Sequence, residues 1–405
     1  MRSRGLSAAL VSGLALLDTT SANLVHITSY TGQLNTLNLT SLSTTDIGGP
    51  GQVFLTRSEV TSECGSNPSW LTQLNDILFC VNENFSGGPG NLAAFRILPE
   101  GGVSFLSNTT TLGGPVHATL FGNNKGLALA NYGTSALQTF NITNPQSVVL
   151  VQNSTFDGKG PNAGRQEKSH PHQVITDPTG NFLIVPDLGT DLIRVFRINQ
   201  ATLGYATVGS LQSAPGSGPR HAAFVTTPFN TTYLYVVHEL TNTLVGYQVT
   251  YRVNSTLGFQ QVYSTTTYGK DDNGNDIPAA SSAGAGEIQA SPDMKFITLS
   301  NRNEGKSSTE NPDPNNSTAL PSDTLVSFAV NQTTGLLTHL QTRAAGGLHP
   351  RHFSFNRDGT LVGVSLKDSA RAVLIERNPE SGQMLDIVAH VEDLGEPSNF
   401  LFIEN

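Results

Sequence analysis

The sequence predicts an all-β protein, a seven-bladed β-propeller closed by pairing of its N- and C-terminal strands. Three observations predict it: a pattern written seven times, a seventh copy split between the two ends, and frequent turn residues. A period of roughly 50 residues with about four short strands per unit is typical of propeller blades. The 40 Gly and 21 Pro residues suit the many tight turns that such a fold needs.

Each copy contains a first β-rich run, a turn, a second run ending in Val, Leu or Ala, a polar pair and a closing alternating run. The clearest copy is HPHQVITDPTGNFLIVPDLGTDLIRVFRIN, residues 170–199. The copies begin near Pro68, His117, His170, Pro219, Glu287, Pro350 and Pro397.

The copy from Pro397 has only its first strand, PSNFLFIEN, and residues 23–42 supply what it lacks. We therefore expect the two ends to pair in one sheet, which leaves no open sheet edge. Equivalent positions of all blades then face one central axis.

The first 22 residues have the pattern of a signal peptide: Arg2 and Arg4, an apolar run over residues 6–17, and a small residue, Ala22, at the end. The alternative is a buried first strand. Residues 23–405 would form one propeller domain. From this leader we expect a secreted, extracellular protein, which could be associated with the cell wall. We expect it to be a glycoprotein because ten Asn-X-Ser/Thr sequons follow the leader. They are Asn38, Asn84, Asn108, Asn141, Asn153, Asn230, Asn254, Asn315, Asn316 and Asn331.

Charge and cysteine content narrow the partners and the compartment. The formal charge of −9 and the pI near 5.5 argue against a nucleic-acid partner. No later segment has 18 consecutive apolar residues, so no membrane span is expected. Cys64 and Cys80 are the only cysteines and would pair in an oxidising compartment; two separate buried thiols are the alternative. The sequence specifies no oligomeric state.

Polar residues recur in two positions of the repeat. One is the start of the innermost strand: His117, His170, His172, Arg220, His221, Glu287, Arg351 and His352. The other is the polar pair after the second strand: Asn82-Glu83, Asn131-Tyr132, His238-Glu239, Asn301-Arg302 and Leu366-Lys367. These residues should meet near the axis.

Arginines at these positions suit a small polyanion, because guanidinium groups match carboxylate and phosphate oxygens. Glu239 could be a base or a partner that fixes a histidine tautomer, and His172 could transfer a proton. The alternative is that polar residues at blade starts hold the ring together; it applies above all to His170 and His221.

Several segments resemble the seven-bladed propeller lactonases, a family that includes 6-phosphogluconolactonases and the carboxy-cis,cis-muconate lactonizing enzyme (carboxymuconate cyclase). They are GPNAGRQEKSHPHQV from Gly160, GSGPRHAAF from Gly216, YVVHELTNTLVGY from Tyr235, EIQASPDMKFITLSNRNE from Glu287 and GGLHPRHFSFNRDGTLV from Gly346. The resemblance implies that His172, Arg220, Glu239 and Arg302 are catalytic. It places Arg165, Gln166, His170, His221, Glu287, Asn301 and Arg351 around the same mouth as substrate-binding residues.

By this resemblance the protein performs lactone chemistry on a small anionic substrate with no metal or organic cofactor, either lactone hydrolysis or carboxymuconate cyclisation. The alternative is a non-catalytic secreted or cell-wall glycoprotein, an adhesin or antigen. A long polar insert directly after Arg302, residues 303–323, lies where it could cover or obstruct the mouth.

Overall fold

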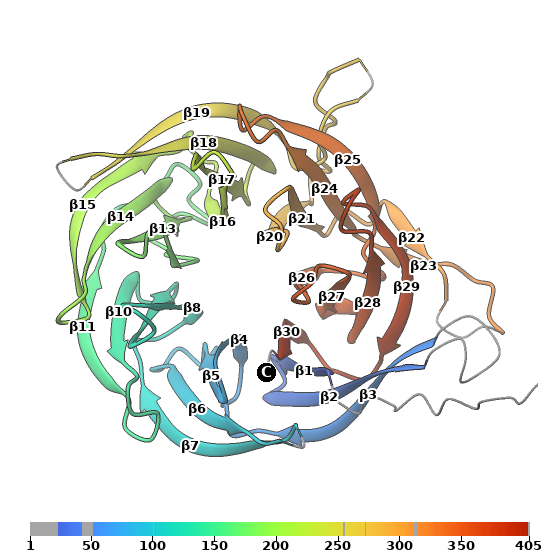
Figure 1. Cartoon of the computed structure of the whole chain (residues 1–405), viewed down its shortest axis with the longest axis horizontal. Helices are drawn as coiled ribbons and strands as arrows, with labels where there is room; N and C mark the ends of the chain where they lie inside the picture. The colour runs from blue at the N-terminus through green and yellow to red at the C-terminus, as the bar shows by residue number, and fades with distance from the viewer. Residues whose placement is uncertain are drawn as a thin grey trace, which may run out of the picture.

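A computed structural model describes residues 23–42, 52–99, 101–253, 256–271, 273–311 and 315–403. The expected signal peptide, residues 1–22, lies outside the described residues. Seven four-stranded antiparallel sheets stand around one central axis (Figure 1), so the predicted seven-bladed propeller is confirmed.

The blades are numbered from the N-terminus and their strands are given from the axis outward. Blade 1 contains β30 (Pro397–Ile403), β1 (Asn23–Ser29), β2 (Gln33–Leu42) and β3 (Gln52–Thr61). Blade 2 contains β4 (Pro68–Leu74), β5 (Ile77–Asn82), β6 (Asn91–Ile97) and β7 (Val103–Thr110). Blade 3 contains β8 (Pro115–Phe121), β9 (Gly126–Asn131), β10 (Ala136–Asn141) and β11 (Val149–Thr155). Blade 4 contains β12 (Ile175–Thr176), β13 (Phe182–Asp187), β14 (Leu192–Asn199) and β15 (Gly204–Gln212).

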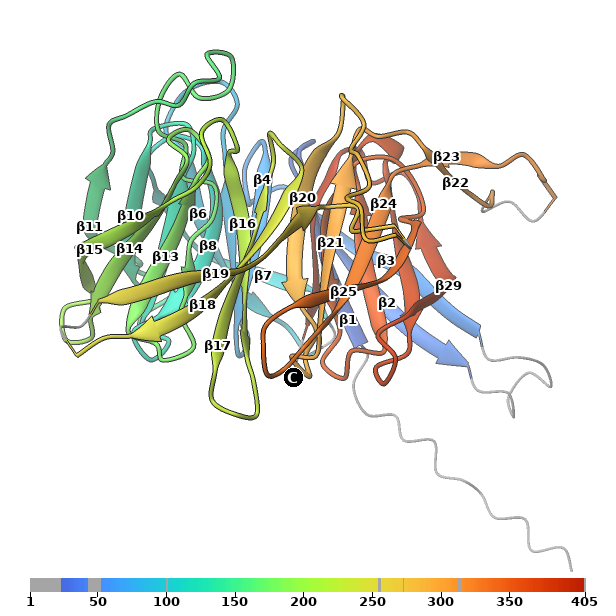
Figure 2. The same cartoon turned by 90° about the horizontal axis from the view of Figure 1, so that it is seen from above.

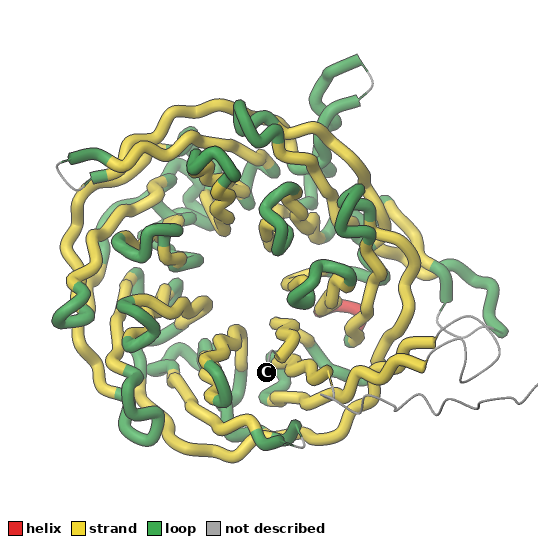
Figure 3. The backbone as a smooth tube through the Cα atoms, in the orientation of Figure 1, coloured by secondary structure: helices red, strands yellow, loops and turns green. Residues whose placement is uncertain are grey.

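The other three blades repeat this order. Blade 5 contains β16 (Pro219–Thr226), β17 (Thr232–His238), β18 (Thr243–Tyr251) and β19 (Leu257–Thr266). Blade 6 contains β20 (Gly284–Ala290), β21 (Phe296–Arg302), β24 (Thr324–Val330) and β25 (Leu337–Ala344). Blade 7 contains β26 (Pro350–Phe355), β27 (Leu361–Leu366), β28 (Arg371–Arg377) and β29 (Met384–Val391). Among the described residues the one helical segment is the 3₁₀ turn η1 (Lys367–Ser369), drawn in red in Figure 3. No helix there is long and apolar enough to cross a membrane.

The burial of each strand follows its distance from the axis. Every residue of the second strands β5, β9, β13, β17 and β21 is buried. The outermost strand β7 is instead mostly exposed beyond its first residue. Second strands lie between two neighbouring blades, which explains their continuous apolar runs. Phe79 of blade 2 and Phe140 of blade 3, for example, belong to one buried cluster.

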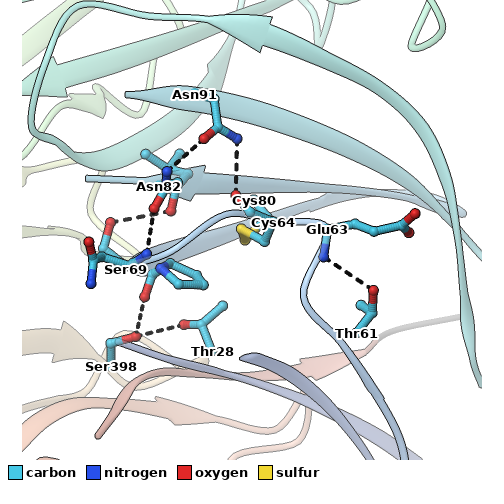
Figure 4. The surroundings of a disulfide bond; sticks show 12 residues. Thr28, Thr61, Glu63, Cys64, Ser69, Cys80, Asn82, Asn91 and Ser398 are labelled. Carbon is cyan, nitrogen blue, oxygen red and sulfur yellow. Dashed lines mark hydrogen bonds between the residues drawn. A yellow bond between two sulfur atoms is a disulfide. The ribbon is translucent and has the colours of Figure 1, made fainter. Parts of the chain in front are cut away.

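Blade 1 closes the ring as the sequence predicts. Strand β1 pairs with β30, with Leu24 opposite Ile403 and Thr28 opposite Asn399. The hydroxyl groups of Thr28 and Ser398 are 2.9 Å apart, and Ser398 Oγ also donates to the carbonyl of Pro68 at 2.6 Å (Figure 4). This contact joins the closing blade to the first strand of blade 2.

A disulfide joins Cys64, in the loop before blade 2, to Cys80 of β5, with the Cα atoms 5.8 Å apart (Figure 4). Asn91 Nδ2 donates to the Cys64 carbonyl at 3.0 Å, and Asn91 Oδ1 accepts from Asn82 Nδ2 at 2.6 Å. The next residue, Gly65, has φ +118°, and a Cβ there would lie 2.5 Å from the Asn82 side chain. The disulfide loop therefore needs glycine at this position.

The innermost strands β4, β8, β16 and β26 each begin with a β-bulge. The pairing register shifts between Pro68 and Trp70, between Pro115 and His117, between Pro219 and His221, and between Pro350 and His352. Successive strand residues normally face opposite sides, and a bulge changes this by inserting one unpaired residue. As a result two consecutive residues of one strand, such as Arg220 and His221, line the same cavity on the axis.

The insert after Arg302 lies outside the ring. Its strands β22 (Ser307–Thr309) and β23 (Leu320–Ser322) pair as a separate hairpin that extends outward from the rim (Figures 1 and 2). The expectation that this segment covers the mouth is therefore wrong for its described residues. At the end of the insert, Asp323 accepts backbone N–H bonds from Asn303, Glu304 and Gly305. These bonds hold the two ends of the insert together.

Candidate active site

The polar residues of the innermost strands enclose a small cavity on the axis. Its volume is about 10 Å³, which is room for about one water molecule. The residues that line it are Ser69, Trp70, Val116, His172, Arg220, His221, Glu287, Arg351, His352 and Ser398. They come from all seven blades, with His172 just before β12, so residues far apart in the sequence meet at one place.

Three arginines surround the carboxylate of Glu239, which follows strand β17. Glu239 Oε2 is 2.9 Å from Arg220 Nε and 3.0 Å from Arg302 Nη2. Its Oε1 is 2.5 Å from Nη2 of Arg165, which comes from the loop before blade 4. Arg220 and Arg302 are almost fully buried, whereas the Arg165 side chain is 45% exposed. One negative and three positive charges leave this cluster with a net positive charge at one side of the mouth.

Backbone carbonyls of β20 fix two of these arginines. Arg220 Nη1 donates to the Gly286 carbonyl at 2.6 Å, and Arg302 Nη2 donates to the Ala285 carbonyl at 2.7 Å. A Cβ on Gly286 would lie 2.4 Å from Ser300 Oγ and 3.2 Å from the Pro350 carbonyl oxygen. Glycine at this position therefore allows the close approach that orients Arg220.

Glu239 remains a carboxylate. Burial favours its neutral form, but the guanidinium groups of Arg302, Arg220 and then Arg165 hold the pKa of Glu239 well below its ordinary value. Among the described residues its ion-pair partners are arginines and no histidine is among them. The expected role as a base or as a histidine partner does not fit this geometry. Glu239 positions the arginines instead.

A second chain of contacts runs through two histidines to Glu287. His221 Nδ1 is 3.0 Å from Glu287 Oε1, and His221 Nε2 is 3.2 Å from His172 Nδ1. Burial, followed by the charge of Arg220, holds the pKa of His172 and of His221 well below 6.5. Both imidazoles are therefore neutral near pH 7. His221 is the middle member of this chain and connects blade 5 to blades 4 and 6.

The opposite side of the mouth carries Tyr30, Glu83 and Arg351. Tyr30 Oη donates to Glu83 Oε1 at 2.6 Å, and Arg351 Nη2 is 3.4 Å from the same oxygen. The Arg351 guanidinium also lies 4.8 Å from the centre of the Tyr30 ring. Sequence reasoning did not select Tyr30 as a site residue. It follows β1 as Glu83 follows β5, so applying the polar-pair position to the split blade could have found it.

Three expected substrate-binding residues instead hold the protein together. The Gln166 amide nitrogen donates to the Leu188 carbonyl and to Asp191, both at 2.8 Å. His170 contacts the Tyr132 carbonyl and Glu167, each at 3.0 Å. The Asn301 side chain is fully buried in blade 6 and lies 3.4 Å from Thr324 Oγ1. In the described part of the chain, no three or more His, Cys, Asp or Glu side chains are grouped to hold a metal ion.

Residues 25–402 match the family described as "Lactonase, 7-bladed beta-propeller". A 6-phosphogluconolactonase of Formosa agariphila is 28% identical over 333 residues, which cover 81% of this chain and 85% of that protein. The 6-phosphogluconolactonase of Bacillus subtilis is 27% identical over 324 residues, covering 78% of this chain and 82% of the relative.

Solved structures share the whole ring. The periplasmic gluconolactonase of Pseudomonas aeruginosa has a TM-score of 0.72 and 25% identity, covering 94% of this chain and 99% of that chain. A putative 6-phosphogluconolactonase of Bacteroides fragilis has a TM-score of 0.74 at 24% identity, covering 95% of this chain and 99% of that chain. The second likeness supports the fold.

Proposed function

The chain belongs to the seven-bladed β-propeller lactonase family, and from this premise we propose that it hydrolyses the lactone of a small anionic sugar acid, of the 6-phosphogluconolactone class. The curated relatives carry that activity in their names. The observation that carries the proposal is that the arginine cluster of Glu239 and the Glu287–His221–His172 chain reach the same cavity through Arg220, His221 and His172. The arginine cluster can bind an anion, and the Glu287–His221–His172 chain can transfer a proton.

The contacts define the tautomers of the two histidines. Burial raises the pKa of Glu287, and nearby cationic groups oppose this rise. As a carboxylate Glu287 can only accept, so His221 Nδ1 carries a hydrogen and donates to it. His221 Nε2 is then an acceptor, and His172 Nδ1 donates to it. This leaves His172 Nε2 without a hydrogen, so it is the nitrogen that accepts a proton from an attacking water.

In the hydrolytic step, the water oxygen forms a bond to the lactone carbonyl carbon while His172 Nε2 takes one water proton. Arg220 stabilises the negative charge that develops on the carbonyl oxygen. The bond from that carbon to the ring oxygen then breaks, and His172 returns the proton to the departing ring oxygen. One water is consumed and the histidine is regenerated. Arg165, which is half exposed, and Arg302 bind the anionic group of the substrate.

The test is hydrolysis of 6-phosphogluconolactone above its spontaneous rate, with unphosphorylated gluconolactone for comparison. His172→Ala should lower kcat by about two to four orders of magnitude, and His390→Ala, at an exposed histidine of β29, should not. Arg165→Ala should raise KM for the phosphorylated lactone more than for the neutral one, and the exposed Arg197→Ala serves as its control.

Other outcomes would replace the proposal. Lactone formation from a carboxymuconate, with no lactone hydrolysis, would make the protein a cyclase that uses the same arginines for carboxylates. A purified protein that turns over neither class, but adheres to cell-wall material, would be a non-catalytic glycoprotein.

We further propose that the enzyme is secreted, extracellular or cell-wall associated. A periplasmic relative offers an exported precedent. The sequon asparagines Asn108, Asn153, Asn230, Asn315, Asn316 and Asn331 are exposed, and Asn38, Asn84 and Asn141 are partly buried. Asn254 lies outside the described residues. N-terminal sequencing of native protein should give a start near Asn23, and a glycosidase should lower its apparent mass; retention of Met1 would refute export through this leader.

A further inference from the structure

Two cavities that reach the inner strands share one wall. The first is the small cavity of the site. The second has a volume of about 1320 Å³ and extends from later positions of four inner strands, including Leu120 of β8, Phe355 of β26 and Leu401 of β30, outward to residues 96–99 of blade 2. Trp70 of β4 lines both cavities. Site residues stand at the starts of the inner strands and the larger cavity follows along the same strands, so Trp70 separates the two.

Aromatic contacts surround Trp70 at this level. The Trp70 ring lies 3.9 Å from His117 of β8, 4.8 Å from His352 of β26 and 5.9 Å from His221 of β16, between ring centres. His117 and His221 also meet edge to face at 5.5 Å. Rings from four blades therefore form one layer across the axis. Trp70, the only tryptophan of the chain, contacts all three histidines of this layer.

We propose that Trp70 is a plug that forms the floor of the active site and keeps the water of the large cavity away from the histidine chain. It is a positioning residue, because it acts through His221 and does not touch the reacting atoms. The catalytic part of this inference rests on the proposed lactone hydrolysis, whereas the separation of the two cavities does not.

The physical reason is the charge state of the histidines. Burial holds the pKa of His117 and His221 well below 6.5 and lowers that of His352 to about 4. Water entering from the large cavity would solvate the charged imidazolium forms and raise these pKa values. A protonated His221 can no longer accept from His172, so the tautomer needed for water activation would be lost. The charged and titratable groups facing this layer are His172, Arg220, Glu239, Glu287, Arg302 and Arg351.

The test compares Trp70→Ala, which opens the floor, with Trp70→Phe, which keeps a ring there. Trp70→Ala should lower kcat about 10–100-fold, the scale of a small misplacement of catalytic groups. The acidic limb of its kcat/KM profile should move to higher pH, since a base with a raised pKa is lost at higher pH. Trp70→Phe should restore most of the rate and the wild-type profile. Phe355→Leu changes the large cavity away from the histidine layer, so it should leave kcat and the pH profile unchanged.

A second readout needs no turnover. Imidazole titrations followed by NMR, assigned with His352→Gln, should show histidine pKa values rising toward 6.5 in folded Trp70→Ala and not in Trp70→Phe. Should Trp70→Ala fail to fold, Trp70→Leu, which also lacks a ring, replaces it. Shifted titrations in a protein without lactonase activity would uphold the plug and refute the proposed function. A folded ring-less variant with unchanged titrations and an unchanged pH profile would refute the plug.

Discussion

Replacing Glu239 with glutamine tests whether this carboxylate positions the arginines. At an effective dielectric constant of about 20, two unit charges about 3 Å apart attract by about 5–6 kcal/mol. Arg220 and Arg302 both stand at that distance from Glu239 and are buried with it. Removing one partner from a buried ion pair costs about 3–5 kcal/mol after desolvation is included. The pair with half-exposed Arg165 adds at most about 1 kcal/mol.

Glu239→Gln should therefore lower the free energy of unfolding by about 3–5 kcal/mol in the absence of anions. Inorganic phosphate should stabilise this variant more than it stabilises the wild type, because a bound anion replaces the missing negative charge. Urea denaturation with and without phosphate measures both effects, and Glu63→Gln at an exposed position is the control.

The difference in unfolding free energy between the wild type and Glu239→Gln should depend on pH, because the pKa of Glu239 is lowered in the folded state. A carboxyl group with a lowered pKa in the folded state contributes its stability above its unfolded pKa, near 4.5, and loses it as the pH falls toward the folded value. The gap between wild type and variant should thus be full at pH 7 and narrow below about pH 4.5. A variant as stable as the wild type, with the same response to phosphate, would refute the positioning role.

Three further predictions test the ring and the mouth. Deleting residues 397–405 exposes the edge of β1 and should give aggregated protein by size-exclusion chromatography, whereas deleting residues 404–405 alone should leave a soluble monomer or native oligomer. The double variant Cys64→Ser/Cys80→Ser should lose about 3 kcal/mol of stability in urea denaturation, since the cross-link spans 16 positions. As a check, the wild type with its disulfide reduced should lose the same amount of stability. Gly286→Ala should raise KM for the phosphorylated lactone and cost about 1–3 kcal/mol of stability by overpacking, because it displaces the carbonyl that holds Arg220. Gly164→Ala, whose Cβ would meet only Asn162 at 3.8 Å, should change neither KM nor stability. Equal effects of Gly286→Ala and Gly164→Ala would refute this reasoning.

The ring could be predicted from the sequence because each blade repeats the same strand pattern, and blade 1 is visible as two complementary fragments. The site could be predicted only in part. Asn301 and Arg302 share one polar pair, yet neighbouring residues of β21 face opposite sides, so Arg302 reaches the mouth and Asn301 is buried within the blade. The bulges reverse this rule on the innermost strands and bring Arg220 and His221 to one cavity. A repeat pattern gives no sign of such a bulge.

Long-range contacts account for the other omissions. Arg165 was expected at the mouth, but its pairing with Glu239, 74 positions away, was not, and Tyr30, which meets Glu83 from another blade, was not named at all. Trp70 stands in a β-rich run where an aromatic residue is normally part of the core. Its place on the axis follows from the assembled ring and not from its neighbours in the sequence.

The pairing of β1 with β30 also determines when the molecule can become complete during its synthesis. Thr28 and its partner Ser398 are 370 positions apart, and every other blade is made between them. A chain emerging from the ribosome carries six blades whose strands follow one another closely, while the inner edge of β1 remains without its partner. The ring is sealed only after β30 has left the ribosomal exit tunnel. Until then the nascent protein is an open arc, and ribosome stalling shortly before Pro397 would hold it in that form.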